Sequence, residues 1–126
     1  VVEKDFVKAV AVWGVPARGR ERYAIEVLRE ASRELEGLQQ QGRIEHFDMV
    51  VLMPQSTEFG GFCLITGSRE QMDSLRHDDD FQRWVNRVQM VADKFGVMDA
   101  WVDQGIPVAL RLYEEALNKV EKGVAT

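Results

Sequence analysis

The sequence predicts an α+β protein in which one antiparallel sheet of four strands is covered on one face by helices. Four short segments are rich in β-branched and aromatic residues, which favour strands. Two longer segments between them repeat apolar residues at intervals of three and four, as amphipathic helices do. The second and third strand segments are separated by a short polar turn, which is typical of a hairpin.

The composition is that of a soluble globular protein. The 126 residues, 45% of them hydrophobic, suffice for a single domain that spans 1–126 and buries a core. A net charge of -5 argues against a nucleic-acid surface, because neutralising phosphates requires a basic patch. We therefore expect no nucleic acid as a partner. We also expect no membrane, since no apolar run approaches the roughly 20 residues of a membrane span.

Cysteine usage indicates a reducing compartment. Cys63 is the only cysteine, so the chain cannot form an internal disulfide, and we expect a cytoplasmic protein. The residue lies within an apolar strand segment, with no cation or helix start beside it to activate the thiol. We therefore expect a buried and inert thiol.

The first half of the chain predicts a strand, a helix and a hairpin. A strand is expected over 6–15 and a helix over 18–41, where apolar residues form one stripe. Strands over 44–53 and 59–66 then form the hairpin. The pair Gly60-Gly61 indicates either a bulge or a close approach of backbones.

The second half begins with two helices. Ser68 and the glutamine three residues later have the spacing of a capping box, which predicts a short helix over 68–75. The acids at 78–80 favour a second helix start, and an apolar stripe follows from Phe81 to Phe95, with Gly96 expected to end this helix.

The remainder predicts one more strand and one more helix. The strand is expected over 97–103, and Gly105 and Pro107 are expected to turn the chain. A C-terminal helix follows over 108–122, and a frayed tail over 124–126. The complete order is the β-α-β-β-α-β plan of ferredoxin-like domains plus one helix.

This order, the strand sequence FGGFCLITG and the segment SLRHDDDFQRWVNRV resemble the dimeric α+β-barrel superfamily. That group includes antibiotic-biosynthesis monooxygenase-like, YCII-like and NIPSNAP-like proteins, and the resemblance covers 6–102. It implies that two ferredoxin-like protomers close into a barrel with a cavity between their sheets. It also implies that this protein, if it is an enzyme, works without a cofactor.

The sheet face without helices supports a homodimer. Every predicted strand carries large apolar side chains on both faces, whereas a face in water should alternate to polar residues. A large exposed apolar face usually marks an interface, so we expect a homodimer through this sheet face. An ordinary, partly apolar surface is the alternative. In a homodimer, the C-terminal helix would extend the dimer contact or cover a sheet edge.

A group of residues on alternating strand positions forms the candidate ligand site. If the strand faces coincide, the inter-sheet cavity holds Lys8, His46, Asp48, Asp99 and Trp101. A histidine beside a carboxylate can act as a general base. The alternative is that these are polar groups of edge strands in water. Trp13, at the end of a strand beside a glycine-rich segment, would stand at the mouth of the cavity.

His77 and Asp78 are a second catalytic candidate. They would form a His-Asp dyad or join a metal site, or else Asp78 caps the following helix. We expect no metal, since the two histidines of the chain have no recognisable ligand spacing.

Two functions follow from these patterns. The first is binding of a small organic molecule in the inter-sheet cavity, or a structural role without a ligand. The alternative is a cofactor-independent monooxygenase-like or YCII-like enzyme that uses a His-carboxylate pair. Nucleotide enzymes and serine hydrolases are disfavoured, because no glycine-rich phosphate loop and no G-x-S-x-G motif occurs.

Overall fold

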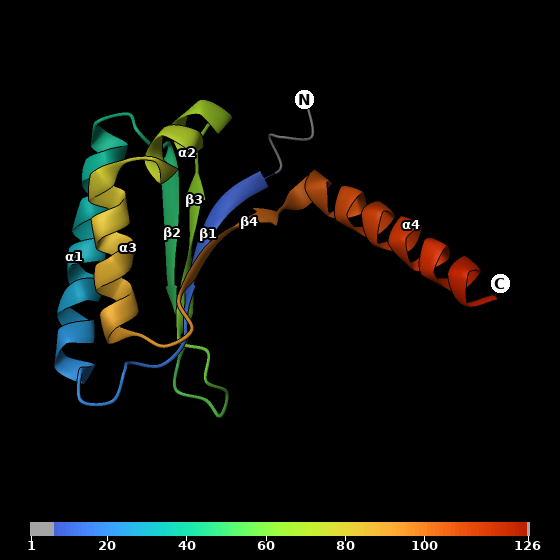
Figure 1. Cartoon of the computed structure of the whole chain (residues 1–126). Helices are drawn as coiled ribbons and strands as arrows, with labels where there is room; N and C mark the ends of the chain where they lie inside the picture. The colour runs from blue at the N-terminus through green and yellow to red at the C-terminus, as the bar shows by residue number, and fades with distance from the viewer. Residues whose placement is uncertain (1–6, 126) are drawn as a thin grey trace. The chain divides into compact units, whose positions relative to one another are not determined.

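The computed structural model describes residues 7–125. In chain order the elements are β1 (Val7–Trp13), α1 (Glu21–Gln40), β2 (His46–Val51), β3 (Gly61–Thr66), α2 (Arg69–Arg76), α3 (Asp79–Val91), β4 (Gly96–Trp101), the short 3-10 helix η2 (Asp103–Gly105) and α4 (Ile106–Ala125) (Figure 1). The expected β-α-β-β-α-β order with a C-terminal helix is confirmed. Phe6, the expected start of the first strand, lies outside the described residues.

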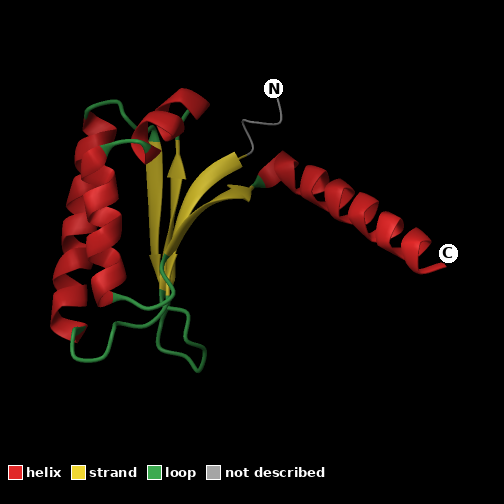
Figure 2. Cartoon of the chain, viewed as in Figure 1, coloured by secondary structure: helices red, strands yellow, loops and turns green. Residues whose placement is uncertain are grey.

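The four strands form one open sheet in the order β2-β3-β1-β4, which is the ferredoxin-like arrangement. β3 pairs antiparallel with both β1 and β2, and α1 and α3 lie side by side on one face of these strands (Figure 2). The register runs without interruption from His46 opposite Thr66 to Val51 opposite Gly61, so β3 has no bulge there. Of the two expectations for Gly60-Gly61, the close backbone approach is correct.

The chain forms two compact units. The larger one, Ala9–Met98, contains most of the sheet and the helices α1, α2 and α3. The terminal unit comprises residues 7–8 and 99–125 of the described chain and includes α4. That both units belong to one domain remains a prediction.

The hydrophobic core of the larger unit lies between the sheet and its helices. Alternation along β1 and β3 directs Ala9, Ala11, Cys63 and Ile65 toward the helices, and all four are buried. Their partners from α1, the α1–β2 loop, α2 and α3 are Leu35, Ile44, Leu75 and Phe81. A second buried cluster joins Val27 of α1 to Val88 and Val91 of α3.

α3 is shorter than the sequence predicts, since it ends at Val91 rather than near Gly96. The backbone of the following residues pairs with the segment after β1: Asp93 N donates to Val15 O, and Gly14 N donates to Asp93 O. Ala92 therefore adopts an extended conformation, although its side chain and that of Phe95 still pack against the core. The hydrogen bond from Asp93 N to Val15 O thus replaces the bond that Asp93 N would donate within a longer helix.

Two further boundaries differ from expectation. Pro107 is expected in the turn before the last helix but lies in the first turn of α4. Proline is tolerated there, because the N–H groups of the first turn have no partner within the helix. The helix also continues to Ala125, so the expected frayed tail is helical up to that residue. The capping box of α2 is confirmed: Ser68 accepts from Gln71 N, and the Gln71 side chain accepts from Ser68 N.

Candidate apolar ligand site

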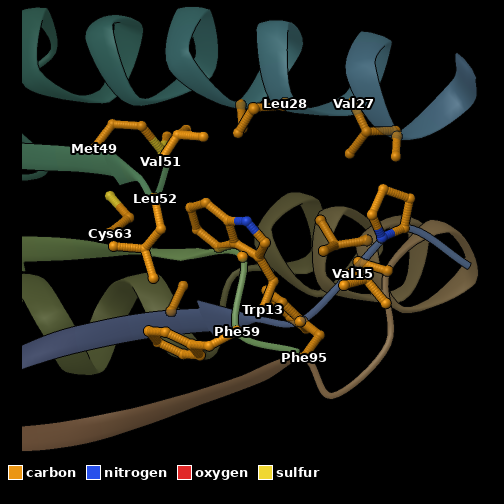
Figure 3. A pocket seen from close by; sticks show the side chains of 18 of the residues that line it. Trp13, Val15, Val27, Leu28, Met49, Val51, Leu52, Phe59, Cys63 and Phe95 are labelled. Atoms are coloured by element: carbon orange, nitrogen blue, oxygen red, sulfur yellow. The ribbon is translucent and has the colours of Figure 1, made fainter. Parts of the chain in front are cut away.

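An apolar cavity of about 330 Å³ lies within the larger unit, on the side of the sheet that faces the helices. α1 contributes Val27 and Leu28, and in Figure 3 Leu28 points toward the side chain of Trp13 in β1, whereas Val27 points toward Val15. The remaining walls come from the ends of β2 and β3, from the β2–β3 loop and from α3. This volume lies at the lower end of the range for small-molecule sites.

The lining of the cavity is almost wholly hydrocarbon. The polar side chains among its lining residues are those of Gln55 and Thr57, both in the β2–β3 loop. The others are apolar residues and glycine, among them Val15, Leu28, Met49, Val51, Leu52, Phe59, Cys63 and Phe95 (Figure 3). Such a surface favours a ligand with an apolar body, because it offers few partners to a polar one.

Glycines bring the backbone close around Trp13. A Cβ at Gly61 would lie 2.7 Å from Cζ2 of the Trp13 indole, and a Cβ at Gly60 would lie 2.2 Å from Gly14 O. Gly60 N also donates to Trp13 O at 3.0 Å. The indole therefore occupies space that a side chain at position 61 would require.

The β2–β3 loop, which forms one wall, is tied by polar contacts. Gln55 Nε2 donates to Phe59 O at 2.6 Å, and Thr57 N donates to Gln55 Oε1 at 2.7 Å. Glu58 forms an ion pair with Lys94, which lies between α3 and β4. That contact lowers the pKa of Glu58 and raises the pKa of Lys94.

Cys63 lies in the cavity wall as an unreactive group. The residue is 2% exposed, and burial, assisted by the charge of Asp48, raises the pKa of its thiol to about 11. At neutral pH it is a protonated thiol and contributes apolar surface. The sequence-based expectation of a buried thiol is confirmed.

His46 and Asp48 are close together but outside this cavity. His46 Nε2 lies 3.0 Å from Oδ1 of Asp48, and both side chains are about half exposed. They lie on the open face of β2, because Phe47 and Met49 between and beside them pack against the core. The spacing of two along a strand correctly predicts that they share a face.

His77 and Asp78 lie between α2 and α3, where His77 is the C-cap of α2 and Asp78 is the N-cap of α3. Asp78 is the N-cap of α3 and accepts from Phe81 N at 3.0 Å, which is the main cause that lowers the pKa of its carboxyl. Its other oxygen lies 3.3 Å from a guanidinium nitrogen of Arg43. His77 Nδ1 is 2.7 Å from Asp73 O. The helix-cap interpretation of Asp78 is therefore correct.

Three other residues of the predicted inter-sheet site lie in the terminal unit. They are Lys8, Asp99 and Trp101, and their place in a common site with His46 stays a prediction. Trp13 lines the cavity on the helix side. Among the described residues, no group of three or more His, Cys, Asp or Glu side chains is arranged to hold a metal ion. No helix in the described part of the chain is long and apolar enough to cross a membrane.

Most of the cavity could not be predicted from the sequence. Leu28, Met49 and Val51 are ordinary apolar positions in a helix and a strand, so their pattern predicts core packing. The signal that identifies a gap is the steric fit of the surrounding side chains, which periodicity does not report. The cluster of glycines near Trp13 is the one sequence feature that points to this region.

Solved structures of similar fold support the ferredoxin-like class. A dimeric ferredoxin-like protein of unknown function from Jannaschia sp. CCS1 matches with a TM-score of 0.58 at 17% identity, over 76% of this chain and 99% of that one. A dimeric protein of unknown function and ferredoxin-like fold from Bacteroides fragilis NCTC 9343 matches with a TM-score of 0.59 at 8% identity, over 75% and 94%.

A DABB family protein with a ferredoxin-like fold from Mesorhizobium loti MAFF303099 matches with a TM-score of 0.57 at 14% identity, over 75% of this chain and 93% of that one. No protein-family model and no curated protein matches the sequence. The chain therefore has the ferredoxin-like α+β fold, and the likeness at these identities concerns the fold.

Proposed function

We propose that this protein binds a small organic molecule with an apolar body in the cavity between α1 and the sheet. The observation that carries the proposal is the cavity itself, which has about 330 Å³ of space and an almost entirely hydrocarbon lining. Small-molecule sites are typically clefts of this kind, lined mostly by apolar and aromatic side chains with a few polar groups.

The rim of the cavity favours the same kind of ligand. Val15, Ile25, Met53 and Phe59 line the cavity and are also exposed large apolar side chains. They make the entrance as apolar as the interior, and large exposed apolar patches mark binding surfaces. A neutral aliphatic or aromatic molecule would remain in contact with hydrocarbon from the entrance inward.

The proposal is tested by titrating the protein with N-phenyl-1-naphthylamine, a neutral apolar dye whose fluorescence rises in hydrocarbon surroundings. We expect saturable binding of one dye per chain. Leu28→Trp, which fills the cavity from α1, should weaken binding at least about tenfold, since 1.4 kcal/mol corresponds to a factor of ten. Leu112→Trp, the same substitution at an exposed position of α4, is the matched control. Equal binding by all three proteins would refute the proposal.

A second proposal concerns assembly: two copies pair through the open face of the sheet. Val12, Val50, Phe62 and Leu64 face that side, because each alternates with a neighbour that packs on the helix side. Two of the similar structures are of proteins described as dimeric. Leu64→Lys, at the centre of the face, should then lower the average mass in light scattering, whereas Gln82→Lys on α3 should leave the mass unchanged.

The His46–Asp48 contact supports an alternative activity. In such a dimer this pair would border the space between the sheets, where the carboxylate could orient the imidazole as a general base for a small organic substrate. An enzyme of this kind needs no cofactor. His46→Gln should then abolish turnover while the dimer persists, and unchanged turnover would exclude a catalytic role for His46.

A further inference from the structure

α4 carries a regular series of large apolar side chains that remain exposed. Ile106, Leu110, Tyr113, Leu117 and Val120 follow one another at spacings of four, three, four and three, and all five are exposed. This is the alternation of a and d positions in a heptad repeat. No side chain described in α4 is fully buried. We call these five residues the α4 seam.

A heptad series fits another helix, and the other long helices of the chain have already used their apolar faces. α1 buries Val27, Ala31 and Leu35, and α3 buries Phe81, Val88 and Val91, in the core of the larger unit. Among the described helices of this length, α4 is therefore the one that still presents a seam. A seam that meets the same seam of a second copy forms a symmetric, self-complementary interface.

The flanks of the seam favour a parallel pair. On one side lie Glu114 and Glu121, and on the other lie Ala109 and Ala116. In a parallel pair each acidic residue faces the small flank of the second helix, Glu114 opposite Ala109 and Glu121 opposite Ala116, so no like charges meet. An antiparallel pair would place Glu114 opposite Glu114 of the second copy. The alanines also allow the two backbones to approach closely.

We propose that α4 pairs in parallel with α4 of a second copy of this chain along the α4 seam. The occupant of the exposed apolar face is thus a second copy, because the seam is self-complementary and its flanks bring no like charges together in a parallel pair. The pairing does not depend on the ligand cavity, which lies in the other unit.

Two leucines of α4 supply a matched pair of variants. Leu117 in the seam is 45% exposed, and Leu112 outside it is 44% exposed, so the two differ in position rather than in burial. Sedimentation equilibrium should show that Leu117→Glu raises the dimer dissociation constant at least about tenfold. Leu112→Glu should change it less than about threefold. Equal effects of the two substitutions, or a wild-type protein that stays monomeric at about 100 μM, would overturn the proposal.

A cross-link tests the parallel direction without relying on stability. In a parallel pair Val120 faces Val120 of the second copy, so Val120→Cys should form a covalent dimer on mild oxidation. The wild-type protein is the control, because its single cysteine is buried. Absence of the covalent dimer would exclude parallel pairing. Loss of stability in Leu117→Glu with an unchanged dissociation constant would show that α4 packs on its own chain, which also overturns the proposal.

Discussion

Trp13 and Gly61 are paired across β1 and β3, and the indole of Trp13 fills the space that a side chain at position 61 would occupy. The pairing sets the position of one cavity wall, because Trp13 lines the cavity whereas Gly61 lets its ring lie close to the sheet. A small residue on one strand thus permits a large one on its neighbour.

Substitution of Gly61 by alanine should therefore destabilise the protein by about 1–3 kcal/mol. The new Cβ would lie 2.3 Å from Val50 O and 2.7 Å from the Trp13 ring, and the backbone atom cannot easily move. Urea unfolding gives the free energy. Gly37→Ala is the control, since no heavy atom lies within 4 Å of its Cβ position in α1. That change should stabilise the helix by about 0.5–1 kcal/mol, and an equal loss at both positions would contradict this interpretation.

Replacing Trp13 by alanine should weaken both folding and dye binding. The half-buried indole packs against the core, so we expect a loss of about 2–4 kcal/mol in the free energy of unfolding. Binding of N-phenyl-1-naphthylamine should fall because one aromatic wall is removed. Trp101→Ala, which alters a tryptophan of the terminal unit, is the comparison in the same titration. If Trp13→Ala bound the dye as tightly as the wild-type protein, Trp13 would not be part of the binding site.

Acid should act partly through Asp78. Its pKa is lowered in the folded protein by the hydrogen bond from Phe81 N and by Arg43, so its contribution to stability is complete above the unfolded pKa near 4. That contribution is lost as the pH falls through the folded value. Asp78→Asn, which retains a capping oxygen but not the charge, should show a smaller loss of melting temperature between pH 5 and 2 than wild type.

Asp79→Asn is the control for this measurement, because it removes a carboxylate from the first turn of α3 but not the cap. A pH dependence of Asp78→Asn equal to that of wild type would show that the Asp78 charge makes no contribution. If Asp79→Asn reduced the pH dependence of the melting temperature as much as Asp78→Asn, any carboxylate in the first turn of α3, and not the cap in particular, would account for it.

Cys63 should resist thiol reagents while the protein is folded. Burial raises the pKa of its thiol to about 11, so the fraction of reactive thiolate at pH 8 is very small. The neutral thiol therefore favours the folded state below the unfolded pKa, and this contribution is lost as the pH rises toward 11. We expect the rate with 5,5′-dithiobis(2-nitrobenzoate) to be at least about 100-fold lower than in urea. Fast labelling of the folded protein would show that the cavity opens readily to water.

The order of elements could be predicted from the sequence because each has a clear periodicity, as the stripe of α1 and the apolar strand around Cys63 illustrate. The end of α3 could not, because Ala92 and Phe95 continue the helical spacing whereas their backbone pairs with residues after β1. The contact of His46 with Asp48 follows from their spacing on one strand. The cavity depends on how side chains from α1, β2 and the loop fill space, which no local pattern encodes.

The most direct test is to locate a bound apolar molecule by nuclear magnetic resonance. Methyl-labelled protein would be saturated with naphthalene, and nuclear Overhauser effects from the ligand to the protein would be recorded. We expect contacts to the methyl groups of Leu28, Met49 and Val51, which line the cavity. Contacts confined to Val12 and Leu64 on the open sheet face, or to the leucines of α4, would contradict it.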